Sequence, residues 1–131
     1  MNAFDPNARA EPGSGIFGLP FSAEDSEIVI VPVPFAATVS YRTGAEHGPR
    51  AILAASHQID LYDHQFGRVY ERGIYLAEAD PEIEAAHARA RPLCQQILSA
   101  AGEPAASELA EIDAAGALVN ASVRSRVAEI L

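Results

Sequence analysis

The chain has 131 residues, enough for one domain. Its net charge is −9, and all nine of its basic residues are arginines. This acidic balance, without a basic patch, argues against a nucleic-acid partner. A single cysteine, Cys94, excludes an internal disulfide and fits a reducing compartment. These 131 residues contain no recognisable signal peptide or membrane-spanning run, so we predict a cytoplasmic protein without a membrane partner.

Residues 1–26 predict a flexible amino-terminal arm, because they are rich in proline, glycine, alanine and acidic side chains. Within this arm, GIFGLPF (Gly15 to Phe21) carries four large apolar side chains. Such groups would cost solubility in a free tail. We therefore expect them to dock, either on this domain or on a neighbouring subunit.

The segment EIVIVPVPF, Glu27 to Phe35, predicts the first strand. Its apolar residues do not alternate, which is typical of a strand buried on both faces in a parallel sheet covered by helices. Pro32 and Pro34 cannot donate ladder hydrogen bonds, so they mark the far end of the strand or an exposed edge. The loop that follows would leave the carboxyl edge of the sheet, where α/β proteins place ligand sites.

A helix is predicted from Pro49 to Asp63, because proline suits a first helical turn and apolar residues then recur at helical spacing. The connection HQFGRVYERG is rich in turn residues. The segment GIYLAEA, Gly73 to Ala79, predicts a second and shorter strand.

Two more helices are predicted. Asp80 and Pro81 are a favourable cap and first position for one of them, and Pro92 should kink or divide it. Cys94 falls on its apolar face and is interpreted as a packing residue, since no basic partner is near it in sequence. The last helix spans roughly Ala105 to Leu131 and carries an apolar stripe.

The sequence closes with RVAEIL, in the middle of this apolar pattern and without a glycine cap. Two strands alone also make a marginal sheet. We interpret residues 27–131 as the first part of a larger α/β domain with a mainly parallel sheet. The alternative is a complete, mostly helical small protein with a frayed end.

The stretch VPVPFAATVSYRTGAEHGPRAILAASHQIDLYD, Val31 to Asp63, resembles the amino-terminal part of the ureohydrolase family of arginases and agmatinases. In that family, a strand ending in a proline-containing turn leads into an arginine- and glycine-containing loop. A Gly-x-x-x-Gly-Pro-x-x-Ile/Leu segment then opens a helix, matched here by Gly44, Gly48, Pro49 and Ile52. The stretch SYRTGAEHGPRAI is most similar to the agmatinase branch. The resemblance implies a three-layer α/β/α fold, incomplete in this chain.

The resemblance also gives the loop a role. Gly44 and Gly48 permit backbone angles that other residues avoid, so the chain can reverse after the strand, and Pro49 then fixes the helix entry. Tyr41 and Arg42 would lean over a substrate pocket at the carboxyl edge of the sheet. The alternative for Arg42 is an ion pair with Glu46 or with a neighbouring subunit.

The resemblance implies a reaction in which two manganese ions share a bridging hydroxide that attacks a guanidinium carbon and releases urea. The substrate would be agmatine or an arginine-like compound, which suggests a place in polyamine metabolism. The family's ligand motifs, Gly-Gly-Asp-His, Asp-x-His-x-Asp and Ser-x-Asp-x-Asp, do not occur here. We therefore assign no catalytic or metal residue and expect no manganese on this chain alone.

The resulting hypothesis is the amino-terminal segment of an agmatinase- or arginase-like enzyme, inactive by itself. It would work in an oligomer, commonly a trimer or hexamer in this family, or with a partner chain. The alternative is a non-catalytic interaction module that docks on a full-length ureohydrolase-like subunit.

One local cluster supports a third hypothesis, a small metal protein. In a helix, His57, Asp60 and His64 would share one face at metal-ligand spacing. The alternative is a solvated last helical turn, which the family comparison favours. His47, beside Gly48, is interpreted as loop surface rather than as a general base.

Overall fold

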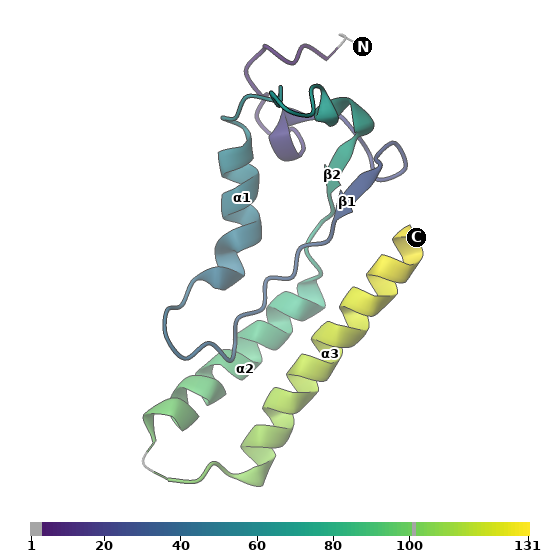
Figure 1. The fold of residues 1–131 in the computed structure, drawn as a ribbon. Helices are drawn as coiled ribbons and strands as arrows, with labels where there is room; N and C mark the ends of the chain where they lie inside the picture. The colour runs from purple at the N-terminus through teal and green to yellow at the C-terminus, as the bar shows by residue number, and fades with distance from the viewer. Residues whose placement is uncertain (1–3, 101) are drawn as a thin grey trace. The chain divides into compact units, whose positions relative to one another are not determined.

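A computed structural model describes residues 4–100 and 102–131 of the chain. The chain, drawn in Figure 1, divides into two compact units, and each unit is built from two separate stretches of sequence. The first unit combines Met1–Val31 with Pro49–Glu78, and the second combines Pro32–Gly48 with Ala79–Leu131. Among the described residues, no helix is both long enough and apolar enough to cross a membrane.

The first unit contains a parallel pair of strands, β1 (Ile28–Ile30) and β2 (Ile74–Leu76). Ile28 lies opposite Ile74, and Ile30 lies opposite Leu76. A parallel pair needs a crossover connection. Here the connection includes the helix α1 (Gly48–Ser56) and the 3₁₀ turn η3 (Val69–Arg72). The predicted α/β character with a parallel sheet is therefore confirmed.

Both strands are shorter than the sequence predicts. Strand β1 ends at Ile30, whereas the prediction extended it to Phe35. Pro32 and Pro34 explain the difference, since neither can donate a hydrogen bond to a neighbouring strand. Ile28 and Ile30 also keep 38% and 37% of their surface exposed. The described residues of this chain therefore do not bury the strand on both faces, contrary to what the sequence predicts.

The predicted helix over Pro49 to Asp63 is wrong in its second half, because α1 ends at Ser56. Asp63 stabilises a turn instead. Its carboxylate oxygen Oδ1 accepts hydrogen bonds from the backbone N–H groups of Gln65 and Phe66, each at 2.7 Å. Its backbone also pairs with Gly67 in an isolated antiparallel bridge. Aspartate side chains compete in this way with helical hydrogen bonding.

The apolar segment of the arm is docked on its own unit, which is one of the two expected alternatives. Ile16 and Leu19 are each only 1% exposed around the 3₁₀ turn η1 (Ile16–Gly18). Phe17 takes a left-handed conformation, with φ of 61°, and donates its N–H to Ser56 Oγ at 2.8 Å. Ser56 Oγ in turn donates to the Leu53 carbonyl at 2.7 Å. The flexibility predicted for residues 1–26 stays a prediction, and residues 1–3 lie outside the described part.

The second unit holds the two long helices, α2 (Pro81–Ser99) and α3 (Ala106–Ile130). The predicted cap of α2 is confirmed, because the Asp80 side chain accepts the Glu82 N–H at 2.9 Å. The Glu108 carboxylate accepts the Ala105 N–H at 2.9 Å and so caps α3. Pro92 lies inside α2, so of the two predicted outcomes, a kink or a division, the division does not occur.

Small side chains form the core of this unit. Ala86, Ala90 and Cys94 recur every four residues on one face of α2 and are buried with Ala37 and Ala115. Such small groups let α2, α3 and the loop backbone approach closely, and Figure 1 shows the two helices side by side. Cys94 is 6% exposed, which confirms that it is a packing residue.

Candidate functional site

The candidate site is the loop of residues 32–48, which continues from the carboxyl end of β1. The loop is well packed at its start, where Pro32 and Pro34 are buried and Ala37 is fully buried. Its middle, from Ser40 to Thr43, is exposed. The loop thus has a buried base, around Pro32 to Ala37, and an exposed tip, Ser40 to Thr43.

Helix α2 holds the base of this loop through two side chains one turn apart. Arg91 Nη1 donates to the carbonyl oxygens of Ala37 and Val39, at 2.9 and 2.8 Å. His87 Nδ1 accepts the N–H of Ala36 at 3.2 Å. These bonds supply partners to backbone groups that have no ladder or helix to pair with.

The two residues predicted to face the substrate lie at the tip. Tyr41 is 86% exposed. The guanidinium carbon of Arg42 lies 5.4 Å from the centroid of the Tyr41 ring, within the range of a cation–π contact. The loop therefore presents an aromatic face that already holds a guanidinium group.

The glycines and the proline of the loop motif have different roles. Gly44 has φ of 114°, a left-handed conformation that a side chain would oppose, as the sequence predicts. Gly48 instead has φ of −50° and ψ of −49°, right-handed helical values open to any residue. The prediction that Gly48 needs special backbone angles is therefore wrong. Pro49 occupies the first turn of α1, where its missing N–H leaves no helical bond unmade.

Glu46 makes the polar contacts at the carboxyl-terminal end of the loop. Its Oε2 accepts the Gly44 N–H at 3.0 Å, and its Oε1 lies 3.7 Å from His47 Nε2 and 3.8 Å from His87 Nε2. Its own backbone N–H, then that of Gly44, and then the two imidazoles hold the pKa of the Glu46 carboxyl below its ordinary value. Among the described residues, Glu46 thus pairs with histidines, and the expected pair with Arg42 is not formed within the chain.

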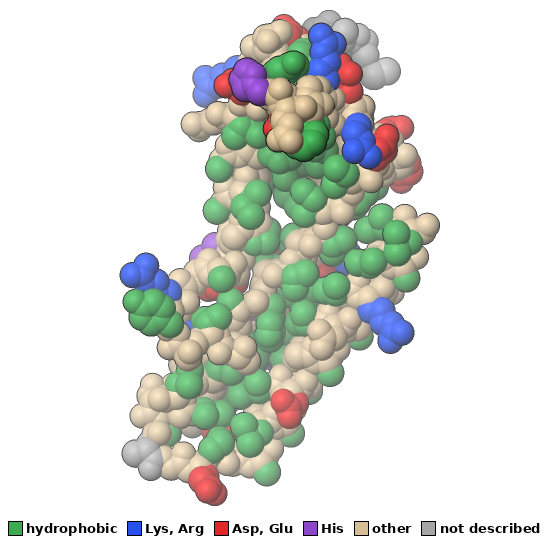
Figure 2. All heavy atoms as spheres, viewed as in Figure 1, with side chains coloured by type: hydrophobic (Ala, Val, Ile, Leu, Met, Phe, Trp, Pro, Cys, Tyr) green, Lys and Arg blue, Asp and Glu red, His purple; other side chains and the backbone are tan. Residues whose placement is uncertain are grey.

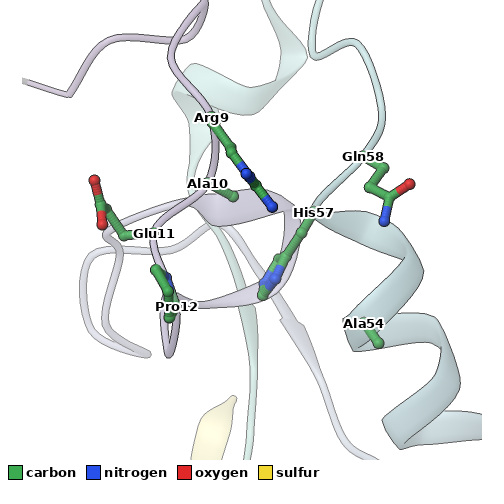
Figure 3. Close-up of a pocket in the computed structure, with 7 residues that line it drawn as sticks. All are labelled: Arg9, Ala10, Glu11, Pro12, Ala54, His57 and Gln58. Carbon is green, nitrogen blue, oxygen red and sulfur yellow. The ribbon is translucent and has the colours of Figure 1, made fainter.

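A second concave surface lies in the first unit, where the arm meets the end of α1. The cavity has a volume of about 510 Å³, and its lining residues are Arg9, Ala10, Glu11, Pro12, Ala54, His57 and Gln58 (Figure 3). His57 Nε2 lies 3.1 Å from the Gly15 carbonyl, so this ring ties α1 to the arm. Sequence reasoning missed this cavity because it depends on how the arm docks. The cavity is open and has no buried unpaired polar group among the described residues to indicate a ligand.

The hypothesis of a metal site on His57, Asp60 and His64 is overturned. The helix that would have aligned them ends at Ser56, and the His64 ring packs edge-on against Tyr62 at 5.7 Å. Across residues 4–100 and 102–131, no group of three or more His, Cys, Asp or Glu side chains is placed to hold a metal. The described residues therefore do not fit a metal centre.

A parallel strand, a glycine-bearing loop and a proline-opened helix lie within the part of the chain that comparison with known proteins matches. The model of the arginase family matches residues 26–110, which is more than half of the chain and includes the whole loop. The chain belongs to the arginase family.

Its curated relatives in this family include N(1)-aminopropylagmatine ureohydrolases. The enzyme of Synechocystis sp. is 48% identical over 56 residues, which are 41% of this chain and 18% of the relative. An enzyme of Thermus thermophilus is 37% identical over 61 residues, or 46% of this chain and 21% of the relative. The chain therefore matches about a fifth of the length of these arginase-family members. No solved structure gives a significant match.

Proposed function

We propose that this chain is the amino-terminal segment of an agmatinase-like ureohydrolase, which hydrolyses a guanidino compound such as agmatine to an amine and urea. The observation that supports the proposal is the family match over residues 26–110, with relatives whose names specify urea release from aminopropylagmatine. We also propose that the protein is soluble and cytoplasmic and that it acts in polyamine metabolism. The single cysteine, which lies buried, supports it.

The exposed tip of the loop supports a guanidino substrate in particular. A guanidinium is planar and weakly hydrated, so it stacks well on an aromatic face. The Tyr41 ring already holds the guanidinium of Arg42 in this way. We propose that Tyr41 offers the same face to the substrate, and that Arg42 leaves it when substrate binds. A contact of this kind at an exposed site is worth about 0.5–1 kcal/mol, which is suited to orientation rather than tight binding.

The catalytic metals belong to another part of the assembly in this proposal. A guanidinium is a poor electrophile and water a poor nucleophile at neutral pH, and bound divalent metal ions would supply the activation that this reaction needs. We propose that the two manganese ions are bound by polypeptide outside residues 1–131. The segment then contributes the start of the sheet and the substrate-side loop but is inactive alone.

Reconstitution tests this proposal. The chain is mixed, in the presence of manganese, with a polypeptide that spans the part of the Synechocystis relative beyond the 56 matched residues. Urea is then measured with agmatine, arginine and N(1)-aminopropylagmatine. We expect urea from the mixture and from neither polypeptide alone, with Tyr41→Ala raising the KM of the mixture. Absence of urea from the mixture with every substrate would refute the proposed function.

A second candidate, a non-catalytic docking module, is favoured by the exposed apolar surface of the second unit. Figure 2 shows hydrophobic side chains along the visible face of α3 toward its end. They border a groove whose apolar lining comprises Val33, Val119, Val123, Val127, Ala128 and Leu131. Light scattering after size-exclusion chromatography separates the cases, because a docking module would form a stable complex with an intact ureohydrolase without changing its urea release.

A further inference from the structure

We propose that His87 and Arg91 are positioning residues, which anchor the loop of residues 36–46 on α2 and thereby hold Tyr41 in place for the guanidinium of the substrate. The inference rests on the proposed function for its substrate and on the hydrogen bonds of the second unit for the anchoring itself. Neither residue belongs to the loop motif that the sequence singles out.

The anchors lie on both sides of the exposed tip. Before the tip, Arg91 binds the carbonyls of Ala37 and Val39, and His87 accepts the Ala36 N–H. After the tip, Glu46 accepts the Gly44 N–H and approaches His87. The residues between these bonds, 40–43, are exposed. Without the anchors, the tip would be held only by the chain on either side of it and by the packing of Ala36 and Ala37 at its base.

The chemistry of both anchors is specific. A planar guanidinium can direct two N–H bonds at two carbonyls, whereas the ammonium of a lysine is a single point charge on a flexible stem. Because the Ala36 N–H donates to His87 Nδ1, the neutral ring carries its proton on Nε2, on the side of Glu46. The His87 side chain is only 15% exposed, so water competes weakly for these bonds.

Limited proteolysis with trypsin tests the anchoring. Cleavage after Arg42 requires the tip to open and extend, whereas cleavage after Arg68, in the first unit, serves as an internal reference. We expect Arg91→Ala and His87→Leu to raise cleavage after Arg42 by about tenfold relative to cleavage after Arg68. His87→Asn retains an acceptor in place of Nδ1 and should largely restore protection, and Arg91→Lys should restore it only in part.

Two outcomes overturn the anchoring: no change in the ratio of cleavage at the two sites, or an equal rise at both, which reports general loosening. The role in substrate binding is judged separately in the reconstituted mixture. There, Arg91→Ala should raise the KM for agmatine several-fold with little change in kcat, and an unchanged KM would overturn that role. If the wild-type mixture releases no urea, the proposed function and the substrate role both fail, while proteolysis still decides the anchoring.

Discussion

At the scale of single residues, backbone conformation separates glycines that the fold requires from glycines that it tolerates. Gly73 has φ of 77°, and a Cβ built on it would lie 2.5 Å from the Asp25 carbonyl oxygen. Gly116, inside α3, has ordinary helical angles and nothing within 4 Å of such a Cβ. The sequence shows both only as glycines, because positive φ depends on the surrounding chain path.

We therefore predict opposite effects of alanine at these two positions. Gly73→Ala should lower the free energy of unfolding by about 2 kcal/mol or more, because it combines a strained backbone with an overlap against backbone atoms. Gly116→Ala should raise it by about 0.5–1 kcal/mol through better helix propensity. Urea denaturation monitored by circular dichroism measures both. Equal effects of the two changes would contradict the assigned conformations.

Asp80, the N-cap of α2, stabilises the fold in its ionised form. The Ser122 hydroxyl, then the Glu82 N–H, and then the charge of Arg126 hold the pKa of the Asp80 carboxyl below its ordinary value. A lowered folded-state pKa means that the ionised form stabilises the fold above the unfolded-state pKa of about 3.9. This stabilisation is lost as the pH falls through the lower, folded-state pKa.

Ser122→Ala should therefore reduce stability at about pH 7, and the difference from wild type should shrink toward about pH 2, as falling pH protonates Asp80. Ser125→Ala is the matched control, since Ser125 lies on the same helix and donates to Glu129 rather than to Asp80. Chemical denaturation at both pH values measures the effect. A Ser122→Ala difference of the same size at both would show that the bond to the carboxylate is not its source.

At the scale of elements, the helices of the second unit could be predicted and the ends of the first unit's elements could not. Asp80 followed by proline, and the long apolar stripe of residues 106–130, are local signals that the structure repeats. At the end of α1, Ser56 Oγ takes part in a tertiary bond, in which it accepts the Phe17 N–H. No local pattern encodes a partner 39 residues away.

Pro92 shows the opposite case, a strong local signal that packing overrides. Proline in a helix interior removes one hydrogen bond and crowds the preceding turn. Yet α2 continues through Pro92, which is itself exposed while Ala90 and Cys94 beside it are buried. The buried face holds the helix together across the defect.

Pro92→Ala should consequently raise the free energy of unfolding by about 1–3 kcal/mol, because it restores the missing hydrogen bond without touching the buried face. Part of the gain is offset by the greater freedom of the unfolded chain. The same substitution at Pro81, in the first turn, is the control and should not stabilise. A destabilising Pro92→Ala would mean that the proline serves the packing.

The candidate site was predictable to the same limited degree. The motif identified Tyr41, Arg42 and Gly44, because their residue types and spacing carry the family resemblance. It did not identify His87 or Arg91, which are more than forty residues further along and act on backbone atoms. Contacts from side chains to a loop backbone leave no pattern in the loop sequence. Only the folded structure therefore shows that His87 and Arg91 contact the loop.

At the scale of the whole molecule, we propose that residues 27–131 form the arginase-family part and residues 1–26 a separate arm. Ile16 and Leu19 are buried and the Phe17 N–H is bonded to Ser56, so the described part of the arm is held firmly around η1. Hydrogen–deuterium exchange should show fast exchange over residues 4–14 and protection at Phe17, lost in Ser56→Ala. Uniform protection over residues 4–26 would contradict the division.

We propose that the chain contributes the substrate-side loop of an arginase-family ureohydrolase whose metal ions are bound by other polypeptide. The most direct measurement is urea release from agmatine by the purified chain alone, with manganese in excess. We expect no urea above the rate without protein. Urea release that scales with the concentration of the chain and disappears with a chelator would contradict it.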